Sequence, residues 1–185
     1  MVVRLAFTSR AVVVIAGLPG AGKSTLIRRA VDPTAVAVVD TDDQRRTGGR
    51  ASNARHYARI LSAVWGRRPV VIHSRGTLGT LRRAITLASL LRGRPVHLIL
   101  LDAPRAAAEE GQRRRGRVIG RRSMDRHVAR WARLLARGPR WEGWTSVTRL
   151  DRPTAAAVDA LAFGAAEPAQ RHLRRRLRGA SAAPA

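Results

Sequence analysis

Short apolar runs alternate along the chain with longer stretches of helical spacing. The apolar runs are almost continuous, as expected of parallel strands that are buried on both faces. They predict strands at residues 11–16, 35–40, 69–74, 95–102 and 146–150. The spacing between them predicts helices at residues 23–31, 53–66, 78–92, 104–115, 123–137 and 154–163. Such alternation predicts an α/β fold in three layers, with a doubly wound, five-stranded parallel sheet at its centre.

Several helix boundaries are also marked in the sequence. Gly66 and Gly93 each stand shortly before a proline and a strand. We expect both glycines to end a helix in the left-handed conformation. The clearest amphipathic pattern is SMDRHVARWARLLAR at 123–137, where Trp131 lies on the apolar face and is expected in the core. Ser123 is predicted as the N-cap of this helix.

The length and composition fit one globular domain. The chain has 185 residues, of which 45% are apolar, and we predict a domain over 1–164 followed by a basic, flexible tail over 165–185. It contains no cysteine, which excludes disulfides and thiolate chemistry and is compatible with the cytoplasm, where we expect it. No apolar run approaches the ~20 residues of a membrane span, so no membrane partner is expected. Residues 1–18 resemble a signal peptide faintly, but cleavage there would remove part of a glycine-rich loop.

The charge of the chain is strongly positive. It carries 36 basic and 12 acidic residues, a formal net charge of +24. Such a field attracts polyanions, and nucleic acid is one candidate partner. A G+C-rich coding bias would also replace lysine by arginine, although it would not explain the scarcity of acids. An arginine stripe on the helix at 123–137 fits either a phosphate backbone or a solvated face. Its members are Arg122, Arg126, Arg130, Arg133 and Arg137.

The most specific motif is GLPGAGKS at 17–24, which fits G-x-x-x-x-G-K-[ST] between a predicted strand and a predicted helix. Its glycines let backbone N–H groups surround phosphates, so the motif predicts ATP and Mg²⁺ as cofactors. Lys23 is the only lysine of the chain. Its compact ammonium can enter a closed loop that a planar guanidinium would not fit, and Ser24 would ligate Mg²⁺. The predicted nucleotide ligands are Gly17, Leu18, Pro19, Gly20, Ala21, Gly22, Lys23, Ser24 and Thr25.

Carboxylates follow the second predicted strand. The stretch VVDTDDQRR at 38–46 carries Asp40, Asp42, Asp43 and Arg45. In an open α/β sheet ligands bind beyond the carboxyl ends of the strands, so these side chains should face the γ-phosphate. A carboxylate there can accept a proton from an attacking hydroxyl or hold water on Mg²⁺. The alternative is an ordinary capped loop that enters a helix.

Together with the arginine-rich GQRRRGR at 111–117, these motifs resemble the small P-loop kinases. The resemblance is greatest to the polynucleotide 5′-hydroxyl kinase type, with zeta-toxin-like, AAA-type ATP-binding kinases nearby, and it covers about residues 11–150. It implies transfer of the ATP γ-phosphoryl group to a hydroxyl acceptor. It also implies that Asp42 is the general base and Arg45 an acceptor ligand. Arg115 would close on the transferred group, with Arg122 as a second candidate that would also contact ATP. Lys23 would act with them in catalysis by contacting the β- and γ-phosphates.

One position departs from that family. Such kinases often carry an aspartate at the end of the third strand, whereas this chain has His73, Ser74 and Arg75. Arg75 would suit an anionic acceptor, and Asp40 would then hold Mg²⁺ through water. The acceptor stays open between a polynucleotide 5′-hydroxyl and a small molecule. Two rivals also stay open: an ATP-binding module without an acceptor, and a nucleic-acid-binding protein with a secondary ATP site.

Overall fold

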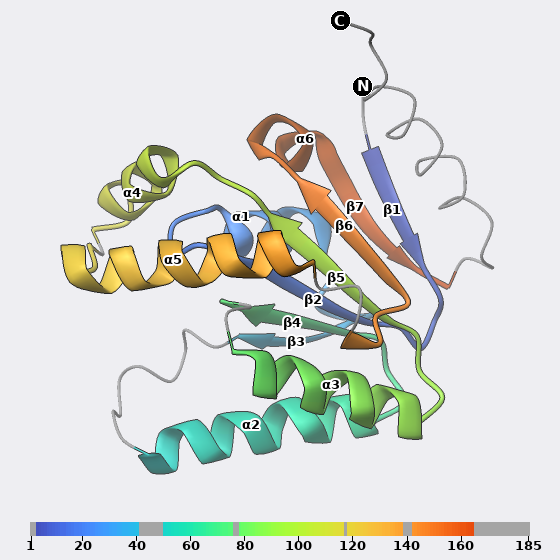
Figure 1. The fold of residues 1–185 in the computed structure, drawn as a ribbon. Coiled ribbons are helices and arrows are strands. Elements are labelled where there is room, and N and C mark those ends of the chain that lie inside the picture. The colour runs from blue at the N-terminus through green and yellow to red at the C-terminus, as the bar shows by residue number, and fades with distance from the viewer. Residues whose placement is uncertain (1–2, 41–49, 76–77, 117, 139–141, 165–185) are drawn as a thin grey trace, which may run out of the picture.

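A computed structural model describes residues 3–40, 50–75, 78–116, 118–138 and 142–164. Its centre is a five-stranded parallel sheet with strand order β3-β4-β2-β5-β6 (Figure 1). The strands are β2 (Val12–Gly17), β3 (Ala37–Asp40), β4 (Val70–Ser74), β5 (Val96–Leu101) and β6 (Ser146–Leu150). The prediction of five parallel strands in an α/β fold is therefore confirmed. The tail at 165–185 lies outside the described residues.

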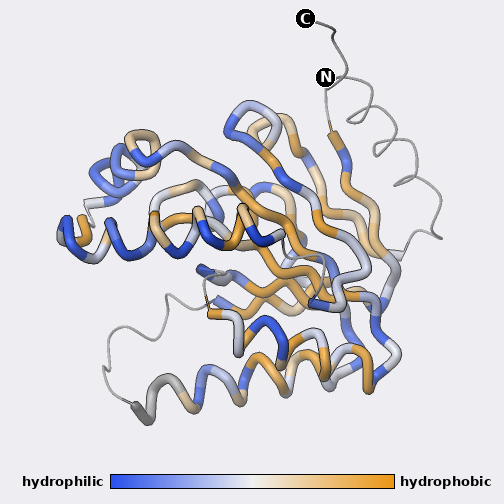
Figure 2. The backbone as a smooth tube through the Cα atoms, viewed as in Figure 1, coloured by the Kyte–Doolittle hydropathy of each residue, from blue (hydrophilic) through white to orange (hydrophobic). Residues whose placement is uncertain are grey.

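The central strand β2 explains why these runs are apolar. All of its residues are buried, since it has β4 on one side and β5 on the other. Val12 pairs with both Val70 and Val96, so the three strands run side by side in the same direction. The carboxyl ends of these strands therefore meet at one edge. Figure 2 shows the sheet as the most apolar part of the chain.

Helices cover both faces of the sheet. They are α1 (Lys23–Ala30), α2 (Arg50–Trp65), α3 (Gly79–Leu91), α4 (Arg105–Arg113), α5 (Arg121–Arg137) and α6 (Arg152–Ala157). Right-handed crossovers place α2, α3 and α5 on one face and α1 on the other (Figure 1). None of the helices that the model describes is long and apolar enough to cross a membrane.

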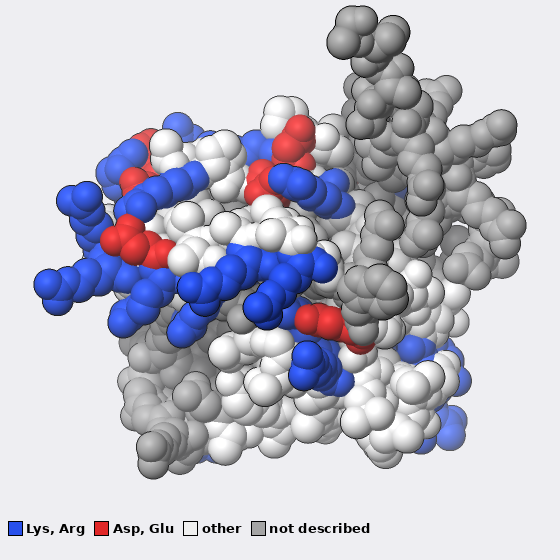
Figure 3. Space-filling view, viewed as in Figure 1, with Lys and Arg blue, Asp and Glu red and all other residues white. Residues whose placement is uncertain are grey.

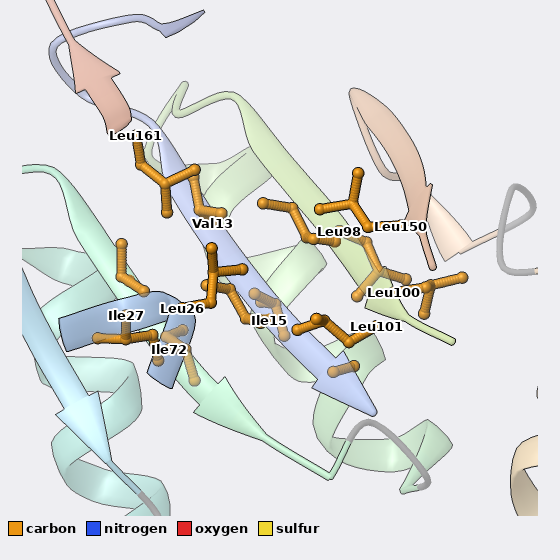
Figure 4. Packing of buried hydrophobic residues seen from close by; sticks show 14 of the residues in the cluster. Val13, Ile15, Leu26, Ile27, Ile72, Leu98, Leu100, Leu101, Leu150 and Leu161 are labelled. Atoms are coloured by element: carbon orange, nitrogen blue, oxygen red, sulfur yellow. The ribbon is translucent and has the colours of Figure 1, made fainter. Parts of the chain in front are cut away.

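The ends of the domain pair with each other, which the sequence analysis missed. β1 (Val3–Phe7) and β7 (Val158–Phe163) form a separate two-stranded parallel sheet. The predicted helix at 154–163 is therefore wrong in its second half. Alanines favour a helix there, but burial of Leu161 in the same cluster as Val13 outweighs this preference (Figure 4). Arg29 of α1 fastens β7, donating hydrogen bonds to the carbonyls of Ala155 and Val158 at 2.6 and 3.1 Å.

The predicted helix ends are only partly right. Gly93 has φ +57° after α3, as expected, whereas Gly66 is not left-handed. α5 begins at Arg121 with Gly120 as its N-cap, so the prediction of Ser123 as N-cap is wrong. The apolar face of α5 is confirmed, since Trp131 is buried. The arginine stripe lies on the exposed side of this helix.

Arg94 is a buried cation that the sequence analysis did not single out. Arg94 stands in the chain between α3 and β5 and is only 3% exposed. Burial, followed by the nearby charges of Arg10 and Arg92, lowers the pKa of Arg94. Its guanidinium donates hydrogen bonds to backbone carbonyls at the amino ends of β2 and β4 and at the end of α2, and so ties three elements together. The acceptors are the carbonyls of Arg10, Ala11, Ala63, Val64, Gly66 and Arg68.

We expect His97 to make stability depend on pH. Burial lowers the pKa of His97 to about 4, while Nδ1 shares a 2.8 Å hydrogen bond with the Ser146 hydroxyl. Between pH ~6.5 and ~4 the unfolded chain binds a proton that the folded chain does not, so stability falls as the pH falls. The expected loss is about 3 kcal/mol by pH 4. Urea unfolding of the wild type and His97→Gln across this window measures it. Parallel pH profiles for the two proteins would contradict the prediction.

Candidate active site

The loop between β2 and α1 is shaped to receive an anion. Gly20 and Gly22 adopt φ values of +88° and +99°, which only glycine takes readily. Gly22 is the N-cap of α1, and no side chain caps this helix. Its first turn contains no acidic residue that would repel a phosphate. The positive end of α1 and its amides therefore fit a phosphate group.

Lys23 lies inside this loop. Its side chain is buried, and Nζ donates hydrogen bonds of 2.9 Å to the carbonyls of Gly17 and Leu18. The ammonium is thus held within the turn of backbone that the motif defines. Ser24 is half-buried in the first turn of α1, and Thr25 is exposed.

The carboxyl edge of the sheet carries a carboxylate–imidazole pair. Asp40 ends β3 and pairs in register with His73 of β4, and Asp40 Oδ1 makes a hydrogen bond with Nδ1 of His73. The His73 side chain is 4% exposed, whereas that of Asp40 is 32% exposed. Because β4 pairs with β2, Asp40 stands two strands from the phosphate loop. Arg75 follows β4 at the same edge and is half-buried.

A second histidine near this pair was missed. His56 of α2 is buried, and neither of its ring nitrogens has a hydrogen-bond partner in the described structure. Burial and then Arg59 lower its pKa, while Asp40 acts in the opposite direction. The signal in the sequence was its helical spacing from Ile60 and Val64, which are buried on the same face.

The arginines of the predicted lid differ in what they contact. Arg113 and Arg114 are exposed and form ion pairs with Glu110. Arg115 and Arg122 are also exposed, but no carboxylate pairs with them in the part of the chain that is described. Arg113 and Arg114 are thus engaged by Glu110, whereas the role expected of Arg115 stays a prediction.

One further residue, Asp102, links the end of β5 to α5 and β6, and the sequence analysis did not single it out. Asp102 follows β5, and its carboxylate accepts a hydrogen bond of 3.1 Å from Nε1 of Trp131. The other carboxylate oxygen accepts hydrogen bonds from the Arg149 guanidinium of β6. The predicted base Asp42 and the acceptor ligand Arg45 lie outside the described residues, as does Asp43.

A comparison with protein families assigns the fold. Residues 12–139, more than half of the chain, match the family model AAA_33, described as an AAA domain. The chain belongs to this AAA domain family. The match spans the phosphate loop, the Asp40–His73 edge, α4 and α5 of this AAA domain. No curated protein matches the sequence.

Solved structures share the architecture of this AAA domain at low sequence identity. A gluconokinase from Sinorhizobium meliloti has a TM-score of 0.60 and 14% identity, over 95% of this chain and all of that one. The toxin–antitoxin system PezAT of Streptococcus pneumoniae has a TM-score of 0.58 and 13% identity, with 95% and 88% covered. Kti12 of Chaetomium thermophilum, in complex with ADP-AlF3, has a TM-score of 0.54 and 17% identity, over 80% of this chain and 94% of that one. These neighbours establish the P-loop kinase-like fold.

Proposed function

We propose that this AAA domain binds Mg·ATP and transfers the γ-phosphoryl group to a hydroxyl acceptor. The observation that carries the proposal is the shared edge of the sheet. The phosphate loop, which leads into α1 without a side-chain cap, and the partly exposed Asp40 carboxylate both lie there. A phosphate cradle alone would serve any nucleotide-binding protein. A neighbouring carboxylate edge adds groups that can hold Mg²⁺ or accept the proton of a hydroxyl. The kinase-like fold of the structural neighbours supports this choice.

The roles of the residues follow from charge. The amides of residues 20–24 and the Lys23 ammonium would hold the β- and γ-phosphates. The hydroxyl oxygen of the acceptor attacks the γ-phosphorus, the bond to the β–γ bridging oxygen breaks, and ADP leaves. The proton of the hydroxyl passes to a carboxylate, which we assign to Asp42. A guanidinium, assigned to Arg115 with Arg122 as the second candidate, would stabilise charge on the transferred group.

Magnesium would be held by the Ser24 hydroxyl and, through water, by Asp40. When bound, the ion would neutralise charge between the β- and γ-phosphates. The oxygen donors of both residues are of the kind that Mg²⁺ prefers. Arg45 and Arg75 are assigned to the acceptor. Two guanidinium groups favour an acceptor that itself carries phosphate or carboxylate, such as the 5′ end of a polynucleotide or an anionic small molecule.

The test is Mg²⁺-dependent transfer of labelled γ-phosphate from ATP. Acceptors would be a 5′-hydroxyl oligonucleotide, and sugar and nucleoside hydroxyls with and without an anionic group. We expect transfer to at least one anionic acceptor. Its rate should fall by about 10²–10⁴ in Asp42→Asn, the range for loss of a general base, while ATP binding persists. ATP binding without transfer to any acceptor would contradict the kinase proposal. Failure to bind ATP would contradict the nucleotide site itself.

A second candidate is an ATP-binding or ATP-hydrolysing module that associates with nucleic acid. The observation in its favour is the arginine stripe of α5, whose side chains form a blue band across the face of the molecule in Figure 3. All five guanidinium groups of the stripe are exposed, and none has an ion-pair partner in the described ranges. The stripe could therefore contact successive phosphates of a strand.

Binding of single-stranded DNA without ATP tests the arginine stripe on which the second candidate rests. If the stripe contacts phosphates, Arg126→Glu/Arg130→Glu should weaken binding and reduce the slope of log K against log[salt] by about 1.4, since each phosphate contact adds ~0.7. Arg55→Glu/Arg59→Glu is a matched control, because these arginines have the same spacing and are exposed on α2. Equal losses in both variants would mean that only the net charge matters, and would reject the stripe as a binding surface.

A further inference from the structure

Helix α4 lies against the phosphate loop at backbone distance. A Cβ added at Gly20 would come within 1.9 Å of the Ala108 carbonyl oxygen, and one added at Gly111 within 2.2 Å of the Gly20 carbonyl oxygen. No side chain fits between the two backbones at these points. The helix that leads into the arginine segment is thus packed on the loop that would bind phosphate.

Gln112 joins these parts through its side chain. It is only 5% exposed, although it stands in the charged run EEGQRRRG. Its Nε2 donates a 3.0 Å hydrogen bond to the Pro19 carbonyl in the phosphate loop. Its Oε1 accepts a 2.9 Å hydrogen bond from the Ile119 amide, just before α5. Nε2 also contacts Sδ of Met124 at 3.7 Å, inside α5.

The position of these contacts is informative. Arg115 lies between the two ends that Gln112 joins, after α4 and before Ile119, and Arg122 lies in the first turn of α5. A movement of the phosphate loop would therefore shift the residues on both sides of the arginine segment, because one amide contacts all three parts. An amide fits these contacts, because it carries both a donor and an acceptor and no charge. A carboxylate could not donate to the Pro19 carbonyl, and an apolar side chain would make neither of the two part-buried hydrogen bonds.

We propose that Gln112 is a positioning residue that couples occupancy of the phosphate loop to the placement of the arginine segment at 113–122. The inference rests on the proposed nucleotide binding and deepens it. Binding of phosphate would fix the Pro19 carbonyl and, through Gln112, the Ile119 amide. By reciprocity, a fixed arginine segment would strengthen phosphate binding. Gln112 itself touches neither reacting atom.

The test compares the wild type with Gln112→Met, which keeps the length of the side chain and removes both hydrogen bonds. The first readout is the Kd of Mg·ATP, measured well below the midpoint of thermal unfolding. The second is hydrogen exchange of the amides around Ile119, with and without ATP. In the wild type we expect ATP to slow exchange there. In Gln112→Met we expect a Kd about 10-fold higher and no ATP-dependent protection. Loss of two part-buried hydrogen bonds corresponds to a change of this order.

Met124→Leu is the matched control, since it removes only the sulfur contact and conserves volume, and we expect its Kd and exchange to match the wild type. If Gln112→Met does not fold, Gln112→Glu replaces it, because its carboxylate can still accept from the Ile119 amide but cannot donate to Pro19. A lower unfolding midpoint with unchanged Kd and unchanged protection would make Gln112 merely structural and overturn the inference. A wild type that does not bind ATP would overturn the proposed function and the coupling together. A wild type and variant that bind ATP equally, with equal protection, would overturn the coupling alone.

Discussion

Replacing Lys23 with alanine is expected to weaken binding of Mg·ATP by about 100-fold or more. The ammonium is buried among the carbonyls of Gly17 and Leu18, where solvent screens its charge poorly. Each charge-assisted hydrogen bond to a phosphate contributes roughly 1.5–3 kcal/mol, and two such bonds account for a change of this size. Isothermal titration with ATP at a fixed Mg²⁺ concentration measures it.

Two further variants sharpen this prediction. Arg28→Ala is the control, because Arg28 is exposed later on the same helix and should leave the Kd unchanged. Lys23→Arg retains the charge but must fit a planar guanidinium into the loop, so we expect it to bind ATP as poorly as the alanine variant. Wild-type affinity in Lys23→Arg would show that the loop opens enough for any cation. The presence of the chain's single lysine at this position would then lack a physical reason.

Replacing Arg94 with methionine is expected to lower the free energy of unfolding by about 3–5 kcal/mol. Two hydrogen bonds from a charged donor, at roughly 1.5–3 kcal/mol each, account for a loss of this size. Methionine fills much of the space but leaves the carbonyls of Val64 and Arg68 without the donors that lie 2.6 Å from each of them. Because these carbonyls stand where α2 ends and β4 begins, we expect the junction to loosen first. Urea unfolding followed by circular dichroism measures the loss.

Arg67→Met controls for the substitution itself. Arg67 is exposed in the same junction, so its replacement should cost less than about 0.5 kcal/mol. Arg94→Lys should recover only part of the stability, because an ammonium has three donors and cannot span the width of the guanidinium. Equal stability of Arg94→Met and the wild type would mean that water replaces the guanidinium. It would contradict the claim that Arg94 stabilises the junction of α2, β2 and β4.

The strands of the central sheet could be predicted because their burial on both faces leaves a continuous apolar run in the sequence. Val12 to Ala16 is one such run, and every one of its residues is buried. The β1–β7 pair could not be predicted in this way. VDALAF at 158–163 carries polar and small residues that suit a helix as well as a strand, and its partner lies more than 150 residues away. The choice is made by tertiary packing, which a local pattern does not contain.

The candidate site likewise contains residues that the sequence could predict and residues that it could not. The phosphate loop is a local motif, so the glycines and Lys23 could be found from spacing. Gln112 could not, since one amide among arginines and glutamates has no periodic signal, and its hydrogen bond to Pro19 joins residues 93 positions apart. The Asp40–His73 pair needed the register of two strands. The sequence located both residues at the edge of the sheet but gave no reason to join them.

The β1–β7 pair also constrains how the protein is made. Val3 leaves the ribosome long before Val158, at which its partner strand begins. During synthesis the backbone groups of β1 stay unpaired with β7 until almost the whole domain has been made. The strands around β2 can pair before that. Pairing of β1 with β7 would therefore be the last step of folding. Contacts between residues so far apart in sequence slow folding. A chain that stopped at Ala157 would leave this strand exposed as an edge open to association with other chains.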